Sequence, residues 1–187
     1  MHVVGVSGSL QERSSTAAVL ASIGDLLTST APVPEPAAHP APATFERFDR
    51  LEELPHFNPD KDTEPAHPAV AEWRTALGDA DAVVIATPEY AHGYPGALKD
   101  ALDWIVGSGE LVDKPVLLVT ASGTGGVRAG EALAPVLHVM SAQVIGPVSI
   151  WGVSPKITDG RLTDADDLGA LTAAIAVLLT YAERPTA

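Results

Sequence analysis

The chain contains no cysteine, and it is poor in basic residues. Without a thiol it cannot form a disulfide, use a thiolate nucleophile or bind a metal through cysteine. Only 11 lysines and arginines stand against 24 acidic residues, which gives a formal charge of −13. A nucleic-acid-binding protein needs a basic face to neutralise phosphates, so this balance argues against that class. A small anion remains compatible, because backbone N–H groups can bind a phosphate inside an acidic protein.

The chain also shows no basic start followed by a long apolar run. We therefore expect neither a signal peptide nor a membrane span, and we expect a cytoplasmic protein that binds no membrane. Its 187 residues are enough for one domain with a substantial core, which we expect to cover residues 1–187. No set of side chains has the spacing of a metal site, so no bound metal is expected.

Short apolar runs alternate with helical patterns along the chain. Near-continuous apolar strands are typical of a parallel sheet that helices cover on both faces. The pattern predicts an α/β fold, a doubly wound three-layer sandwich of the flavodoxin or Rossmann kind with a five-stranded parallel sheet. The expected strands are residues 3–7, 44–49, 82–87, 116–120 and 143–150, and the expected helices are 15–27, 68–77, 95–106, 127–140 and one that begins near 163.

One stretch, APVPEPAAHPAPA at residues 31–43, interrupts this alternation. Proline at this density excludes a helix or a central strand, and it predicts an excursion over the surface. A simple connecting loop is the plainer interpretation, and a docking or substrate-covering segment is the alternative.

The loop after the first strand, GSLQERSST at residues 8–16, is rich in hydroxyl groups. Ser9, Ser14, Ser15 and Thr16 surround the start of a predicted helix, and Arg13 adds a positive charge. Free N–H groups at a helix start, together with hydroxyl donors, are suited to a phosphate monoester. Ordinary capping of the helix by Ser14 or Ser15 is the alternative. The motifs of an ATP-type phosphate loop, a dinucleotide fold and a nucleophile elbow are all absent.

The loop after the third strand is longer than a strand-to-helix connection requires. It begins with Pro88, Glu89 and Tyr90, and its glycines allow close approach of a ligand to the backbone. This composition suits a planar ring system, although packing of Tyr90 and Tyr94 under the loop or at a subunit interface is the alternative. His92 is expected to face solvent, because no acidic partner stands at metal or triad spacing.

The loop after the fourth strand, TASGTGGVRA at residues 120–129, brings three glycines together with two hydroxyls. Such a loop can be a plain turn, but its backbone donors can also approach a ligand edge closely. Because the carboxyl ends of parallel strands meet at one edge of the sheet, the three loops together predict one ligand pocket.

These residues resemble a known family. PEYAHGYPGALKDALDW, from Pro88 to Trp104, is similar to the signature of NADPH-dependent FMN reductases of the flavodoxin-like fold, and SGSLQERSST and SGTGGVRA resemble that family's phosphate and glycine loops. The resemblance implies the strand order 2-1-3-4-5, FMN as cofactor and NADPH or NADH as co-substrate. It implies FMN contacts from Ser9, Gln11, Arg13, Ser14, Ser15 and Thr16 at the phosphate, from Pro88, Glu89, Tyr90 and Ala91 at the ring, and from Ser122, Gly123, Thr124, Gly125 and Gly126 at the ring edge.

The chain departs from the family pattern at three of these positions. Gln11 stands where the family often has arginine, with Arg13 two residues on as the substitute. Thr16 and Ala91 each replace an asparagine and so lose an amide.

The function expected from the resemblance is hydride transfer from a nicotinamide to bound flavin, and then reduction of a flavin, quinone or similar small acceptor. The cofactor carries this chemistry, so no catalytic side chain is expected. A flavodoxin-like electron carrier and an azo-, quinone- or metal-oxyanion reductase are the alternatives. The resemblance also implies a homodimer or homotetramer in which the helix after Pro-Gly is buried, and Tyr94, Leu98, Trp104 and Ile105 are the apolar residues expected at that interface.

Overall fold

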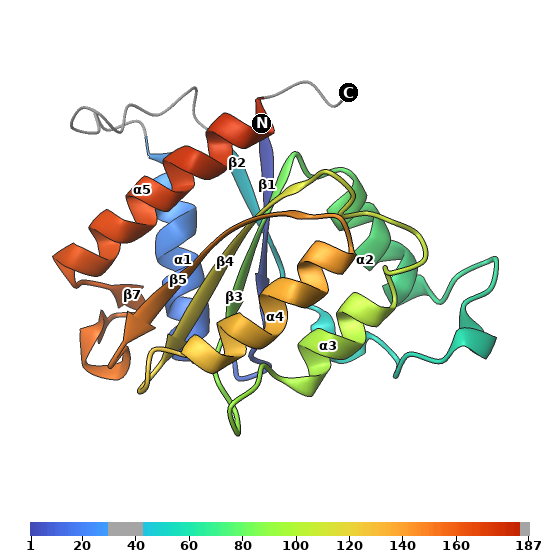
Figure 1. Cartoon of the computed structure of the whole chain (residues 1–187), viewed down its shortest axis with the longest axis horizontal. Coiled ribbons are helices and arrows are strands. Elements are labelled where there is room, and N and C mark those ends of the chain that lie inside the picture. The colour runs from blue at the N-terminus through green and yellow to red at the C-terminus, as the bar shows by residue number, and fades with distance from the viewer. Residues whose placement is uncertain (30–42, 184–187) are drawn as a thin grey trace.

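The computed structural model describes residues 1–29 and 43–183. The proline-rich stretch expected at 31–43 lies outside these ranges except for Ala43, which is buried. The described residues form a three-layer α/β sandwich (Figure 1).

A five-stranded parallel sheet forms the middle layer, in the order β2-β1-β3-β4-β5. This order confirms the predicted fold and strand sequence. The central strands are apolar because helices cover them on both sides, and all six residues of β3 are buried. The strands are β1 (His2–Ser7), β2 (Thr44–Phe48), β3 (Ala82–Thr87), β4 (Pro115–Ser122) and β5 (Gln143–Trp151).

Helices pack on the two faces of the sheet and bury two separate apolar clusters. On one face lie α1 (Ser15–Thr28) and α5 (Ala165–Ala182), and on the other lie α2 (Pro68–Gly78), α3 (Gly96–Asp103) and α4 (Val127–Val139) (Figure 1). Asp164 caps α5, its side chain accepting a hydrogen bond from the amide of Asp167, in the segment where the residue pattern predicts a helix start.

The helix after Pro95 is shorter than the predicted span of 95–106. It begins at Gly96 and ends at Asp103, and Pro95 is its N-cap residue. Trp104 and Ile105 lie just beyond it and are only 1% exposed. With Leu98, they belong to the core that α3 shares with the sheet, so they supply no surface for a subunit interface. The interface argument based on these side chains was wrong, because their apolar character serves the chain's own core.

The structure also has short elements that the prediction did not include. Three are 3-10 helices, at Leu51–Glu53, Pro59–Lys61 and Ser154–Lys156. A two-stranded antiparallel hairpin, β6 (Ile157–Thr158) and β7 (Arg161–Leu162), lies outside the main sheet between β5 and α5.

By length and composition α5 could cross a membrane, contrary to the expectation that no segment has this character. Its 18 residues include an apolar face, on which Leu171, Ile175, Leu178 and Leu179 are buried. That face packs against the sheet, so in the structure α5 is a covering helix of the sandwich.

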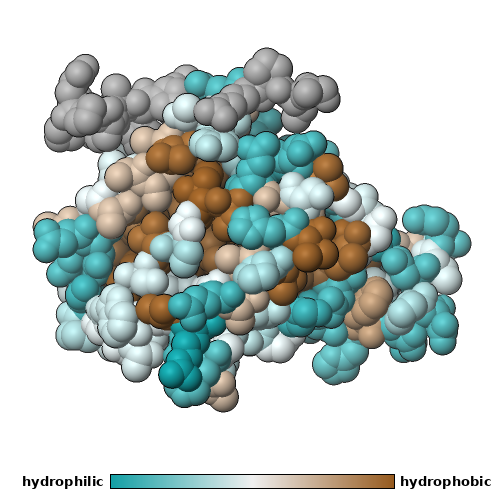
Figure 2. Space-filling model, viewed as in Figure 1, coloured by the Kyte–Doolittle hydropathy of each residue, from teal (hydrophilic) through white to brown (hydrophobic). Residues whose placement is uncertain are grey.

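Figure 2 shows where hydrophobic side chains reach the surface on one side of the molecule. They gather along β5 between α4 and α5, over a strand that forms the edge of the sheet. Val144, Ile145 and Val148 of this strand are only partly buried.

Candidate functional site

The three loops singled out in the sequence begin at neighbouring strand ends. Ser7 of β1 lies opposite Ala86 of β3, and Thr87 of β3 lies opposite Thr120 of β4. The loop after β1 is also joined to the end of β3, because the Gly8 amide donates a hydrogen bond of 2.8 Å to the carbonyl of Ala86. The structure therefore brings the three predicted loops to one edge of the sheet.

Ser14 has the capping role weighed as an alternative. Its hydroxyl accepts a 3.0 Å hydrogen bond from the Ala17 amide and so satisfies one free donor of α1. The hydroxyl of Ser9 is also engaged, accepting from the Gln11 amide at 3.3 Å. Both hydroxyls shape the loop and hold its backbone in place.

Other donors of the first loop remain available. Within the described ranges, the amides of Ser15 and Thr16 have no acceptor, and Arg13 is exposed and forms no ion pair. Unpaired amides in the first turn carry the positive end of the helix dipole. The start of α1 is thus able to receive a negatively charged group.

The loop after β3 closes on itself in a tight turn. Tyr90 and Gly93 exchange backbone hydrogen bonds of 2.8 Å and 3.0 Å. Between them, Ala91 and His92 have φ angles of 49° and 65°. Two successive residues of positive φ define a type I′ turn, a position where Asn-Gly is preferred and alanine is strained. The turn presents Tyr90, which is 55% exposed, so packing beneath the loop does not explain that residue.

Glu89 turns toward helix α4. Its Oε2 atom accepts hydrogen bonds from the amides of Arg128, at 3.0 Å, and Ala129, at 3.2 Å. The N-cap residue of α4 is Gly126, which has no side chain, so Glu89 caps this helix from another loop. The side chain thereby couples the loops after β3 and β4.

The charge of Glu89 is stabilised by these contacts. Partial burial by itself raises the pKa of the carboxyl, but the amides of Ala129 and Arg128 and the ring of His92 outweigh this effect and hold the pKa below its usual value. The Nδ1 atom of His92 lies 3.6 Å from Oε1 of Glu89. His92 is exposed, as expected, but it does have an acidic neighbour, which the prediction missed.

The glycine loop after β4 packs tightly at its second half. Gly125 and Gly126 have φ angles of 77° and 69°, which strain any residue with a side chain. A Cβ atom at Gly125 would overlap the indole ring of Trp151, whereas one at Gly123 would meet nothing within 4 Å. Ser122 accepts a 3.2 Å hydrogen bond from the Thr124 amide and holds the first half of the loop.

Trp151 lies beside this loop, and the sequence patterns did not single it out. It ends β5, opposite Ser122 of β4, and it remains 56% exposed while resting against Gly125. The signal available in the sequence was a tryptophan directly after the predicted strand at 143–150, whereas its exposure and its contact with the glycine loop follow only from the structure.

The order of these elements agrees with a known family over most of the chain. The family model for NADPH-dependent FMN reductases matches residues 1–154. The chain belongs to this family.

Individual relatives extend this assignment. A quinone reductase of Escherichia coli (strain K12) is 32% identical over 151 residues, which span 76% of this chain and 80% of the relative. An NADPH azoreductase of Bacillus sp. (strain OY1-2) is 41% identical over 121 residues, 64% of this chain and 63% of the relative. The solved structure of FerB, a flavoenzyme NAD(P)H:(acceptor) oxidoreductase from Paracoccus denitrificans, superposes with a TM-score of 0.78 at 25% identity and covers 97% of each chain.

As a member of the NADPH-dependent FMN reductase family, the chain is an NAD(P)H-dependent flavin oxidoreductase. FMN is the cofactor and NADPH or NADH is the electron donor. The residues present fit an FMN phosphate, because the start of α1 offers unpaired amides and the exposed Arg13. The sequence left open whether the chain is a reductase or a flavodoxin-like electron carrier. Family membership favours the reductase.

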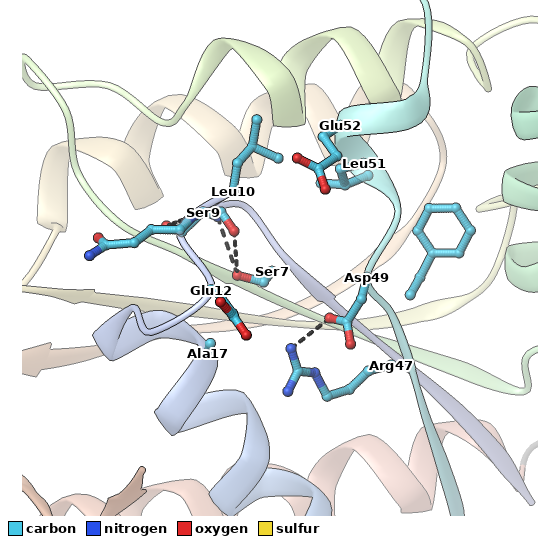
Figure 3. Close-up of a pocket in the computed structure, with 11 residues that line it drawn as sticks. Ser7, Ser9, Leu10, Glu12, Ala17, Arg47, Asp49, Leu51 and Glu52 are labelled. Carbon is cyan, nitrogen blue, oxygen red and sulfur yellow. Dashed lines mark hydrogen bonds and ion pairs between the residues drawn. The ribbon is translucent and has the colours of Figure 1, made fainter.

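Two hollows border the first loop. The smaller, of about 220 Å³, separates the loop from the end of β2. Figure 3 shows Arg47 and Asp49 paired with each other on the β2 side of this hollow, with 2.6 Å between Nη2 and Oδ1. Its lining includes one arginine and three carboxylates, a balance that disfavours a phosphate. The larger lies between α1 and the β6–β7 hairpin. Neither hollow is lined by the loops 88–91 or 122–126.

No group of three or more histidine and acidic residues with the arrangement of a metal site occurs in the ranges 1–29 and 43–183.

Proposed function

We propose that the three loops at the carboxyl edge of the sheet form the FMN site of this reductase. The observation that carries the proposal is their convergence beside unpaired amides at the start of α1. The loop after β1 receives the phosphate, the turn after β3 supports the flavin ring, and the glycine loop after β4 approaches the ring edge. The residues assigned are Ser9, Gln11, Arg13, Ser14, Ser15, Thr16, Pro88, Glu89, Tyr90, Ala91, Ser122, Gly123, Thr124, Gly125 and Gly126.

These residues have different tasks within the proposed site. The amides of Ser15 and Thr16 and the guanidinium of Arg13 bind the phosphate directly, because within the described residues none of them is committed to another acceptor. Ser9 and Ser14 position the phosphate loop, since their hydroxyls accept hydrogen bonds from its backbone. Glu89 is a positioning residue as well, because its carboxylate is committed to α4.

The protein binds and orients the cofactor and its substrates, and it needs no catalytic acid or base of its own. FMN, when bound, supplies the redox chemistry by accepting a hydride from the nicotinamide and passing electrons to the acceptor. The chain's part is to hold the ring with one face open to both substrates. The exposed rings of Tyr90 and Trp151 stand at this edge of the sheet.

We propose a flavin, a quinone or a similar small planar molecule as the acceptor. Two relatives are a quinone reductase and an azoreductase, and exposed aromatic side chains suit stacking with a planar acceptor. An azo compound and a metal oxyanion are the competing acceptors on the same scaffold.

One experiment tests the FMN and nicotinamide assignment. Purified protein is mixed with FMN and NADPH, and loss of nicotinamide absorbance is followed with and without a quinone. We expect turnover well above the free-flavin background and a yellow protein with a flavin spectrum. A rate equal to the background would contradict the proposal.

We propose that the chain assembles into a homodimer or homotetramer. The support is the hydrophobic surface along β5 (Figure 2) and Val139 of α4, a valine that is 83% exposed. Sedimentation at micromolar concentration is expected to give a mass of two or four chains, and Val139→Asp is expected to reduce it. A wild-type mass of one chain would contradict the assembly.

We also propose that the protein acts in the cytoplasm, where NADPH and NADH are available as electron donors. Cell fractionation followed by detection of the chain tests this, and recovery in a membrane or extracellular fraction would contradict it.

A further inference from the structure

A cleft of about 560 Å³ lies between the start of α1, the end of β2 and the β6–β7 hairpin. Arg13, Arg47 and Arg161 line it, each from a different one of these segments, together with Ser15 and one carboxylate, Glu12. The chain has only 11 lysines and arginines against 24 acidic residues, so three arginines around one hollow are unusual for it. Asp25 and Asp49 each pair with one of these arginines and Glu12 lines the cleft, so it is the free guanidinium donors, and not a net positive charge, that favour an anion.

Arg161 is held in place by its surroundings. It follows the hairpin turn at Asp159 and Gly160, whose φ angles are 48° and 72°. The hairpin is fastened to α1, because the amide of Leu162 donates a 2.9 Å hydrogen bond to the Ser22 hydroxyl. The α1–β7 contact is visible in Figure 1. Such an anchored side chain loses little freedom when it binds a ligand.

The two other arginines of the cleft keep donors free. The Nε atom of Arg161 is bound to Asp25 at 2.5 Å and its Nη1 atom donates to the carbonyl of Gly160, which leaves Nη2 without an acceptor in the described ranges. Arg47 pairs with Asp49 through Nη2, and its Nε and Nη1 atoms have no acceptor among the residues that the structure describes. Each carboxylate orients a guanidinium without using all of its donors.

The cleft is larger than an FMN phosphate requires, and it reaches a segment outside the family pattern. The start of α1 is enough for that phosphate, whereas Arg161 belongs to residues beyond 154, where the match to the family model ends. Resting on the proposed function, we take the electron donor as the source of a second phosphate, which is either the pyrophosphate that both coenzymes carry or the 2′-phosphate that only NADPH carries. NADPH carries a 2′-phosphate that NADH lacks, and a phosphate dianion is the group that guanidinium donors bind most strongly.

We propose that the cleft lined by Arg13, Arg47 and Arg161 binds the 2′-phosphate of NADPH and gives this reductase its preference for NADPH over NADH. Arg13 stands between the two phosphates, and Arg47 and Arg161 contact the 2′-phosphate alone. The coenzyme then extends from the flavin ring past the first loop to the hairpin.

Arg161→Ala tests the proposal, with Arg161→Lys as the conservative variant and Lys61→Ala as the matched control. Lys61 is exposed and does not line the cleft. Removing Arg161 is expected to lower kcat/KM for NADPH about tenfold or more and to leave kcat/KM for NADH unchanged, since the lost hydrogen bonds involve a charged group. Arg161→Lys is expected to retain part of the activity with NADPH. Lys61→Ala is expected to leave kcat/KM unchanged for both coenzymes. An equal effect on both coenzymes, or no effect, would overturn the proposal.

Calorimetry provides a readout that does not depend on turnover. Adenosine 2′,5′-bisphosphate and adenosine 5′-monophosphate are titrated into FMN-loaded wild type and Arg161→Ala. The bisphosphate is expected to bind wild type more tightly, and this difference is expected to disappear in the variant. Equal binding of the two nucleotides to wild type would overturn the cleft assignment, even if FMN reduction proceeds. If instead the variant lost affinity for FMN, the cleft would belong to the FMN phosphate.

The variant is expected to fold, because the Arg161–Asp25 pair is largely exposed and such pairs contribute little to stability. Arg47→Ala removes a donor that comes from a different strand. It is also expected to reduce the preference for NADPH over NADH. An unchanged NADPH preference in both variants would reject the proposal.

Discussion

Glu89 accepts a hydrogen bond of 3.2 Å from the amide of Ala129, although 40 positions separate the two residues in the chain. The bond joins the loop after β3 to the start of α4, so the two loops that flank the proposed ring site are held at a fixed spacing. The carboxylate also meets the positive end of the α4 dipole, where an anion is favoured.

Replacing Glu89 by glutamine is expected to lower the melting temperature at neutral pH. Glutamine can still accept a hydrogen bond, but it lacks the negative charge that faces the helix start. Glu131→Gln is the matched control, because Glu131 is exposed on the same helix. Thermal unfolding of the three proteins at pH 7 measures the effect, and equal melting temperatures for Glu89→Gln and wild type would contradict it.

The stabilisation by Glu89 is expected to depend on pH. The pKa of its carboxyl is lower in the folded chain than its ordinary value of 4.5. Its contribution is therefore fully present above pH 4.5 and is lost as the pH falls through the folded-state pKa. The difference in melting temperature between wild type and Glu89→Gln should accordingly shrink on acidification. A constant difference down to pH 3 would show that the charge is not the cause.

Asparagine in place of Ala91 is expected to stabilise the protein. Ala91 has a φ angle of 49°, a region that costs an ordinary residue about 1–2 kcal/mol and that asparagine tolerates better. We expect a gain of up to about 1 kcal/mol from Ala91→Asn and a loss from Ala91→Val, because a β-branched residue fits this region worst. Urea unfolding measures both. A loss in the asparagine variant would contradict the strain at this turn.

Local patterns in the sequence are sufficient to predict the architecture. The apolar run of residues 82–87 is buried throughout, and the polar group Asp164 caps α5, because burial and capping act over a few residues. The hairpin at 157–162 was missed although its Asp159-Gly160 pair is a strong type I′ turn signal. Here the cue was local and was overlooked.

Contacts between distant residues explain the other differences. Glu89 resembles a ligand-binding carboxylate until its position beside α4 is known, and Trp151 joins the site only because β5 pairs with β4. Trp104 and Ile105 have the composition of an interface, yet they are buried in the chain's own core. Periodicity indicates that a side chain is buried, but it does not indicate what covers it.

Alanine at Gly125 is expected to displace Trp151. The added Cβ atom would overlap the indole ring, and the φ angle of 77° disfavours any side chain there. We expect a lower melting temperature, a shifted tryptophan emission and weaker FMN binding. Gly123→Ala in the same loop is the control and should leave the emission unchanged, because its Cβ atom has open space. The same emission spectrum in both variants would contradict the contact.

The double replacement of Ser9 and Arg13 by alanine is expected to weaken the binding of FMN by several kcal/mol. The phosphate of FMN carries about −1.5 to −2 charges at neutral pH, and hydrogen bonds between charged partners contribute about 1.5–3 kcal/mol each. Arg13 has no ion pair in the described ranges, so its charge is available to the ligand, and Ser9 holds the Gln11 amide in the loop. Riboflavin, which lacks the phosphate, should bind wild type and the variant about equally. Flavin-fluorescence titration separates the outcomes: if the variant binds FMN as tightly as wild type does, the loop at residues 8–16 caps α1 and holds no phosphate.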